Sequence, residues 1–235
     1  MLALLITISN NTSYAGNAAT YKMTVQSIQL KKSDGTWVTI AQPNQEIDIA
    51  SVSAGATAAS LLSDAPIPVG QYVNFKMVFS ETMKFSGSDG AHYTVAGSTV
   101  TVNGDNAGLS ASTATWTTDP PANTTLDETN ESHSATEPAG GAGEVTAVLN
   151  LDKNDADNYI EVYRGTDLAT PISITADSAV TMFFDFDTQG TINYIDYGGT
   201  NDIMFFSPPQ EGTKFQITVD GTTSTLSESQ MQVDF

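Results

Sequence analysis

The sequence predicts an all-β protein, built as a β-sandwich or a jelly-roll-like double sheet. Apolar and polar residues alternate in short runs, and turn-forming residues separate these runs. No stretch keeps a helical apolar period over the roughly ten to twelve residues that would indicate a long helix. About a dozen short strands at this spacing, without a helical layer, are typical of sandwich architectures.

The first part of the chain, residues 1–19, is expected to be a distinct apolar N-terminal segment. Its apolar run is too short to span a bilayer as a helix. The run resembles the central part of a secretory signal with cleavage after Ala15, although no Lys or Arg precedes it. Alternatively it is a strand, paired within its own sandwich or added to a neighbouring subunit. The side chains that would fill pockets at alternate positions of that strand are Leu2, Leu4, Ile6 and Ile8.

Residues 20–235 are expected to form one β-sandwich domain, which opens with a hairpin. Polar and apolar residues alternate over residues 21–30, and the apolar positions change parity after Gln26 and Ser27, which predicts a β-bulge. Residues 33–36 (Ser-Asp-Gly-Thr) then predict a tight turn into a strand at residues 37–40.

The next elements are a short strand, an Ala-rich segment and a long central strand. Residues 47–49 predict the short strand, and residues 51–62 predict a short turn of helix or a crossing loop. Pro68 and Gly70 shape a turn before the central strand, in which Tyr72 is a candidate corner tyrosine. The later strands are expected at residues 71–79, 83–85, 92–95, 98–102, 145–151, 159–163, 179–187, 192–197, 203–206, 214–219 and 232–235.

Four motifs in these elements resemble a domain-of-unknown-function family of exported prokaryotic β-sandwich proteins, many of them lipoproteins. They are residues 34–40 (Asp-Gly-Thr-Trp-Val-Thr-Ile), 47–49 (Ile-Asp-Ile), 67–72 (Ile-Pro-Val-Gly-Gln-Tyr) and 180–187 (Val-Thr-Met-Phe-Phe-Asp-Phe-Asp). The resemblance covers residues 20–95 and 172–192. It implies a transthyretin-like or related β-sandwich and no established chemistry. The chain departs from the family in lacking a lipobox cysteine and in carrying a long insertion.

That insertion, residues 117–143, is rich in Pro, Gly, Thr and acidic residues. Such a composition cannot bury enough apolar surface to fold alone. We expect an exposed acidic loop between the two halves of the sandwich, with a contact arm as the functional alternative.

Charge and cysteine content restrict the function. Acidic residues outnumber basic ones 27 to 8, which gives a formal net charge of −19. Nucleic acids and anionic lipids are bound mainly through Lys and Arg, so neither is expected as a partner. The absence of cysteine excludes disulfides and thiolate metal sites. This composition favours an extracellular or cell-surface protein.

One acidic cluster offers candidate ligands for calcium, the single cofactor for which the sequence gives a site. Calcium takes six to eight oxygen ligands, and turns rich in Asp and Asn supply them. The candidate ligands are Asp152, Asn154, Asp155 and Asp157. They do not fit the EF-hand spacing, and an Asx-rich turn between two strands is the alternative.

No catalytic constellation is evident, so the chain is expected not to be an enzyme. Its two histidines, His92 and His133, lie far apart in sequence, and no motif resembles a nucleophile elbow. Asp185 and Asp187 alternate with phenylalanines and are expected on one solvated face.

The sequence favours a pilus-like extracellular structural subunit that self-assembles into a filament or surface layer by donor-strand complementation. Its partner would be a further copy of itself. The alternative is a secreted carbohydrate-binding or adhesive module, whose glycan-binding side chains would be Trp116, Tyr194 and Tyr197. Oligomeric state separates the two, since the module would remain a monomer.

Overall fold

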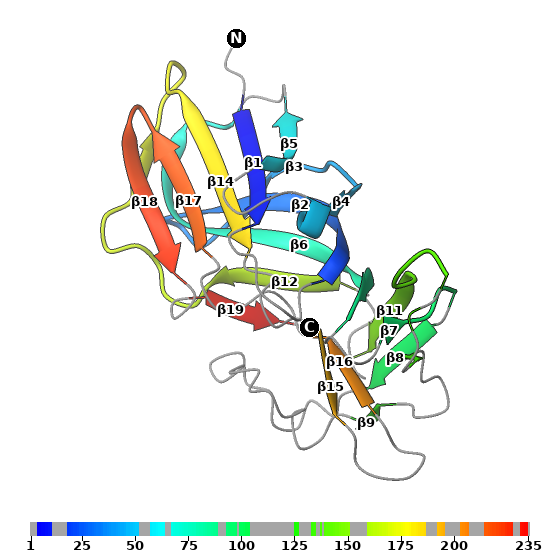
Figure 1. The fold of residues 1–235 in the computed structure, drawn as a ribbon. Helices are drawn as coiled ribbons and strands as arrows, with labels where there is room; N and C mark the ends of the chain where they lie inside the picture. The colour runs from blue at the N-terminus through cyan, green and yellow to red at the C-terminus, as the bar shows by residue number, and fades with distance from the viewer. Residues whose placement is uncertain are drawn as a thin grey trace.

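The fold is all-β and sandwich-like, as predicted, in a computed structural model of the chain. The structure describes residues 4–10, 18–51, 57–63, 67–88, 93–97, 99–103, 125–126, 133–134, 137, 139–150, 159–186, 192–195, 203–206, 214–227 and 231–234. Two main sheets carry most of these residues (Figure 1).

The smaller main sheet has five strands. Its order is β18 (Thr222–Ser227), β17 (Lys214–Val219), β14 (Val180–Phe186), β1 (Leu4–Asn10) and β5 (Thr57–Ser63). Strand β1 is parallel to β14, while β1–β5, β14–β17 and β17–β18 are antiparallel. Strand β1 therefore stands inside the sheet.

The larger sheet has ten strands arranged around β6 (Gly70–Gly87) and β2 (Ala18–Lys32). Its main path is β19 (Met231–Asp234), β12 (Tyr159–Arg164), β6, β11 (Val145–Asn150), β8 (Thr99–Asn103) and β9 (Thr125–Leu126). Strand β2 pairs with β6, β3 (Trp37–Ala41) and β4 (Gln45–Asp48), and β13 (Ile172–Ile174) pairs with β6.

Three smaller elements complete the described fold. They are the pair β7 (Tyr93–Thr94) and β10 (His133–Ser134), the pair β15 (Ile192–Ile195) and β16 (Ile203–Phe206), and the 3-10 helix η1 (Ile49–Ser51). Strands β9 and β10 belong to the expected insertion at residues 117–143 and pair with β8 and β7. Most of the remaining insertion lies outside the described residues.

The core lies between the two main sheets, whose strands cross in Figure 1. Aromatic side chains join them. Phe75 of β6 lies 6.0 Å, between ring centroids, from Phe215 of β17, and Phe79 lies 5.9 Å from Phe186 of β14. All four rings are buried. The alternation of apolar residues along β6 and β14 thus supplies the two facing surfaces of the sandwich.

The predicted bulge in β2 is confirmed. Tyr21, Met23 and Val25 are buried before it, and Ile28 and Leu30 are buried after it. The pairing of β2 with β6 shifts register between Val25 and Ser27, where the apolar positions change parity. The extra residue returns the apolar side chains to the core face.

The predicted turn at residues 33–36 is also confirmed, and it closes the β2–β3 hairpin. The Lys32 amide donates to the Thr36 carbonyl over 2.8 Å, and the Asp34 carboxylate accepts from the Thr36 amide over 2.9 Å. Gly35 has a φ of 91°, a conformation that favours glycine. The hydrogen bond from the Thr36 amide lowers the pKa of Asp34.

Tyr72 is the corner tyrosine that the sequence predicts. Its side chain is buried, and its hydroxyl donates to the Pro68 carbonyl at 2.5 Å. Burial raises the pKa of the phenol. The contact fastens the turn before β6 to the strand that follows it.

We expect Tyr72→Phe to lower the free energy of unfolding by about 1 kcal/mol, because one buried hydrogen bond is lost at nearly unchanged volume. Urea denaturation followed by fluorescence measures this change. An unchanged midpoint would show that the hydroxyl does not hold the corner.

Several expectations about the elements were wrong or incomplete. Residues 57–63 form strand β5, not a turn of helix or a crossing loop, because β1 offers them a paired edge. Residues 71–79 and 83–85 belong to one 18-residue strand, β6. Strands β9, β10, β13 and β18 were not predicted, and the first two lie in the segment expected to be an exposed loop.

The expectation that Asp185 lies on a solvated face was also wrong. Asp185 is 3% exposed, and Asp187 lies outside the described residues.

Candidate functional site

The predicted subunit-contact strand lies inside the five-stranded sheet. Ile6 stands opposite Met182 of β14 and Leu61 of β5, and Ile8 stands opposite Phe184 and Ala59. Leu4 begins β1 and pairs with Ser63, while Leu2 lies outside the described residues. The structure thus places three of the four predicted contact residues on one paired strand.

Strand β1 lies between β14 and β5 and pairs with both of them. Met182 and Phe184, which stand opposite Ile6 and Ile8, are 0% and 1% exposed. The next strand along the chain, β2, belongs to the other main sheet. Within its own sheet, β1 is therefore held by pairing with β14 and β5, not by a short hairpin connection.

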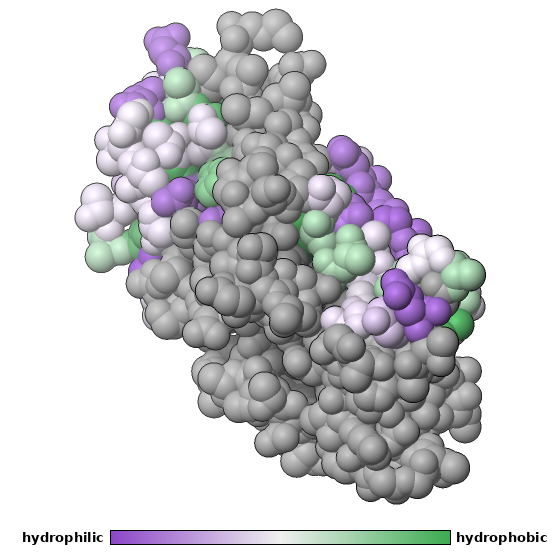
Figure 2. All heavy atoms as spheres, in the orientation of Figure 1, coloured by the Kyte–Doolittle hydropathy of each residue, from purple (hydrophilic) through white to green (hydrophobic). Residues whose placement is uncertain are grey.

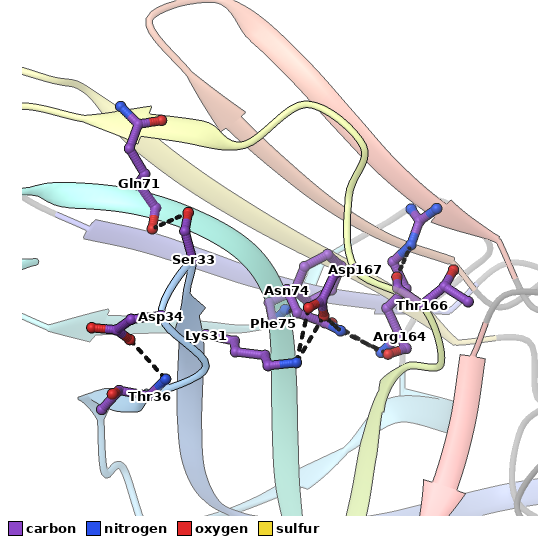
Figure 3. A network of polar contacts seen from close by, with 10 residues as sticks. All are labelled: Lys31, Ser33, Asp34, Thr36, Gln71, Asn74, Phe75, Arg164, Thr166 and Asp167. Carbon is purple, nitrogen blue, oxygen red and sulfur yellow. Dashed lines mark hydrogen bonds and ion pairs between the residues drawn. The ribbon is translucent and has the colours of Figure 1, made fainter.

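A polar network lies where β2, β6 and the segment after β12 meet (Figure 3). The Lys31 ammonium lies 2.9 and 3.0 Å from the two carboxylate oxygens of Asp167. The Asn74 side-chain nitrogen donates to the Asp167 Oδ1 over 3.0 Å and to the Arg164 carbonyl over 2.8 Å. Hydrogen bonds from Asn74 and Lys31 lower the pKa of Asp167.

The sequence analysis missed this network. Its one visible signal is Asn74, a polar residue inside the apolar run of residues 71–79. Asn74 is 4% exposed, so its amide needs hydrogen-bond partners, and its two acceptors, the Arg164 carbonyl and the Asp167 carboxylate, lie 90 and 93 residues further along the chain.

An aromatic and charged cluster lies on the ten-stranded sheet. The rings of Trp37 and Tyr163 meet edge to face with centroids 6.5 Å apart. The Lys76 ammonium lies 4.8 Å from the centre of the Trp37 ring and forms an ion pair with Glu161. Lys76 therefore covers one face of the indole ring, and that face is closed to a stacking ligand.

Two further ion pairs involve the ten-stranded sheet. Lys22 of β2 pairs with Glu144, which lies just before β11, and Lys84 of β6 pairs with Glu46 of β4. In the view of Figure 2, the apolar residues of the described part form small separate areas among polar ones. That view therefore offers no broad apolar patch made of described residues.

The remaining predicted sites cannot be built from the structure. Asp152, Asn154, Asp155 and Asp157 all lie outside the described residues. Trp116 and Tyr197 do too, whereas Tyr194 lies in β15, where its backbone pairs with Met204 of β16. The proposals for a calcium site and for a glycan-binding site stay predictions.

Comparison with protein families matched residues 13–208 to the Domain of unknown function (DUF4382). The chain belongs to this family. The match confirms the predicted membership in a domain-of-unknown-function family, while export stays a prediction. The matched range begins after β1 and ends before β17. Neither a curated protein nor a solved structure matches the chain. Among the described residues, no helix is long and apolar enough to cross a membrane.

Proposed function

We propose that this DUF4382 protein is an extracellular structural subunit, and that copies assemble into a filament or surface layer by exchanging β1. The observation that carries the proposal is the interior position of β1 in the five-stranded sheet. A strand that joins two others mainly through main-chain pairing can be supplied by another copy with the same hydrogen bonds.

The register of β1 supports this exchange. Residues 5–10 pair with residues 181–186 of β14. On the other side, β5 pairs with β1 over residues 57–63, with a register shift between Ile8 and Ser9. A strand with partners on both sides makes about twice the ladder hydrogen bonds of an edge strand. A donated β1 would therefore bind its acceptor tightly.

The connection between β1 and β2 also permits exchange. Eight residue steps separate Asn10 from Ala18, and a fully extended chain of this length spans about 26 Å. We expect a connection of this length to let β1 join the same sheet of an adjacent copy while β2 stays in its own large sheet. Repeated in one direction, such contacts build an open polymer.

The test compares the full chain with a variant that starts at Asn17, by sedimentation velocity and negative-stain electron microscopy. We expect the full chain to form regular polymers. We expect the truncated chain to remain monomeric and to bind a synthetic peptide of residues 1–10, because the gap between β14 and β5 is then open.

A matched pair of point variants separates strand pairing from side-chain effects. Thr7→Pro removes a backbone donor in the middle of β1 and should abolish polymers. Thr7→Val keeps a strand-forming residue and should retain them. If the full chain is a monodisperse monomer under all conditions, the proposal is wrong, and the binding-module alternative is then tested on glycan arrays.

A further inference from the structure

Three side chains from different parts of the chain meet at one end of the β2–β6 pair. Lys31 and Asn74 stand directly opposite each other in the antiparallel register of these strands. Asp167 contacts both, and its Oδ1 accepts a hydrogen bond from each of their side-chain nitrogens, at 3.0 Å in both cases. In Figure 3 the lysine nitrogen and the Asn74 amide converge on this carboxylate.

The Asn74 carboxamide is held and polarised by backbone groups. Its oxygen accepts from the Phe75 amide over 2.9 Å and from the Arg164 amide over 3.3 Å. Two backbone donors on one carbonyl oxygen are the arrangement that stabilises a tetrahedral oxyanion. The side chain is 4% exposed, so this amide has little access to water as a competing nucleophile.

We propose that Lys31 and Asn74 condense into an intramolecular isopeptide bond, with Asp167 as the proton carrier. The Asp167 carboxylate takes a proton from the Lys31 ammonium, and the free amine attacks the Asn74 Cγ. A bond from Nζ to Cγ forms, and the Cγ–Nδ2 bond breaks. Asp167 returns its proton to the departing nitrogen, which also takes a proton of the attacking amine and leaves as ammonium. No oxidant or further reactant is needed.

The ionised state of Asp167 allows the first step but makes it slow. Hydrogen bonds from Asn74 and Lys31 keep the pKa of Asp167 low, so the carboxylate is free of its proton but is a weak base, and proton transfer from the Lys31 ammonium is uphill. Lys31 and Asp167 keep 26% and 43% of their side-chain surface exposed. Water therefore stabilises the ion pair, and the condensation is expected to be slow.

The product would tie together the two longest strands of the fold, β2 and β6. In a chain without cysteine, such a bond constrains the unfolded chain as a disulfide would. This inference stands on the contacts of Lys31, Asn74 and Asp167 and is independent of strand exchange. It holds or fails whether or not the protein polymerises.

The test is the intact mass of the folded protein during incubation at mildly alkaline pH, where more of the lysine is deprotonated. We expect a species lighter by one ammonia molecule, which accumulates with time. Tandem mass spectrometry should find one cross-linked pair of peptides joined between Lys31 and Asn74. Lys31→Arg keeps the cation next to Asp167 but should abolish the species, and so should Asp167→Ala.

Controls exclude succinimide formation, a reaction that could imitate this result. Succinimide formation at an asparagine also releases ammonia, but it neither joins two peptides nor depends on Lys31. Lys76→Arg changes a lysine that pairs with Glu161 and should leave the mass loss intact. An unchanged mass of the wild-type protein overturns the proposal. Loss of water also overturns it, because the electrophile would then be a carboxyl group such as that of Asp167.

Discussion

Phe215→Ala should lower the free energy of unfolding by about 3–5 kcal/mol, the range found when a large buried aromatic side chain is removed. Phe215 is 0% exposed and contacts rings of both sheets. Its ring centroid lies 4.7 Å from that of Phe184, 5.7 Å from that of Phe186 and 6.0 Å from that of Phe75. Alanine would leave a cavity between the sheets, where crossing strands have little freedom to close it.

The measurement is urea denaturation at equilibrium, with the slope of the transition checked for two-state behaviour. Phe183→Ala is the matched control. Phe183 precedes Phe184 in β14, is only half-buried and lies outside the core cluster. Its loss should cost clearly less. Equal losses for the two variants would contradict the assignment of Phe215 to the centre of the core.

Much of this core could be predicted from the sequence because its signals are local. The alternation in residues 180–186 places Val180, Met182 and Phe184 on one face, and all three are buried. The change of parity near Ser27 predicted the bulge. A strand that keeps one face in the core needs an extra residue at the point where its apolar positions change parity. Local turn residues likewise gave the β2–β3 hairpin.

The other elements depend on partners far along the chain. Residues 57–63 (Thr-Ala-Ala-Ser-Leu-Leu-Ser) have a weak strand preference, and they form β5 through pairing with β1. Strand β18 is rich in Thr and Ser and forms an edge next to β17. The Lys31–Asn74–Asp167 network joins positions 93 and 136 residues apart, and no sequence spacing reveals such contacts.

Gly143→Ala should destabilise the protein by about 3 kcal/mol, at the upper end of the cost of overpacking. A Cβ at this position would lie 2.2 Å from the Ala96 nitrogen and 2.6 Å from the Ala96 Cα. The clash is with backbone, so no rotamer change relieves it. Two hydrogen bonds hold the segments in place: the Gly143 amide donates to the Thr94 carbonyl and the Gly97 amide to the Glu144 carbonyl. The added methyl must push these segments apart.

Gly221→Ala separates this steric effect from the general loss of a glycine. Gly221 has a φ of 81° and no heavy atom within 4 Å of an added Cβ, so its substitution should cost about 1 kcal/mol through backbone strain alone. Thermal and urea denaturation of both variants measure the difference. Because Val145 follows two residues later and is 0% exposed, displacement of Gly143 also disturbs the start of β11. A Gly143→Ala variant as stable as Gly221→Ala would show that these two segments do not approach as closely as described.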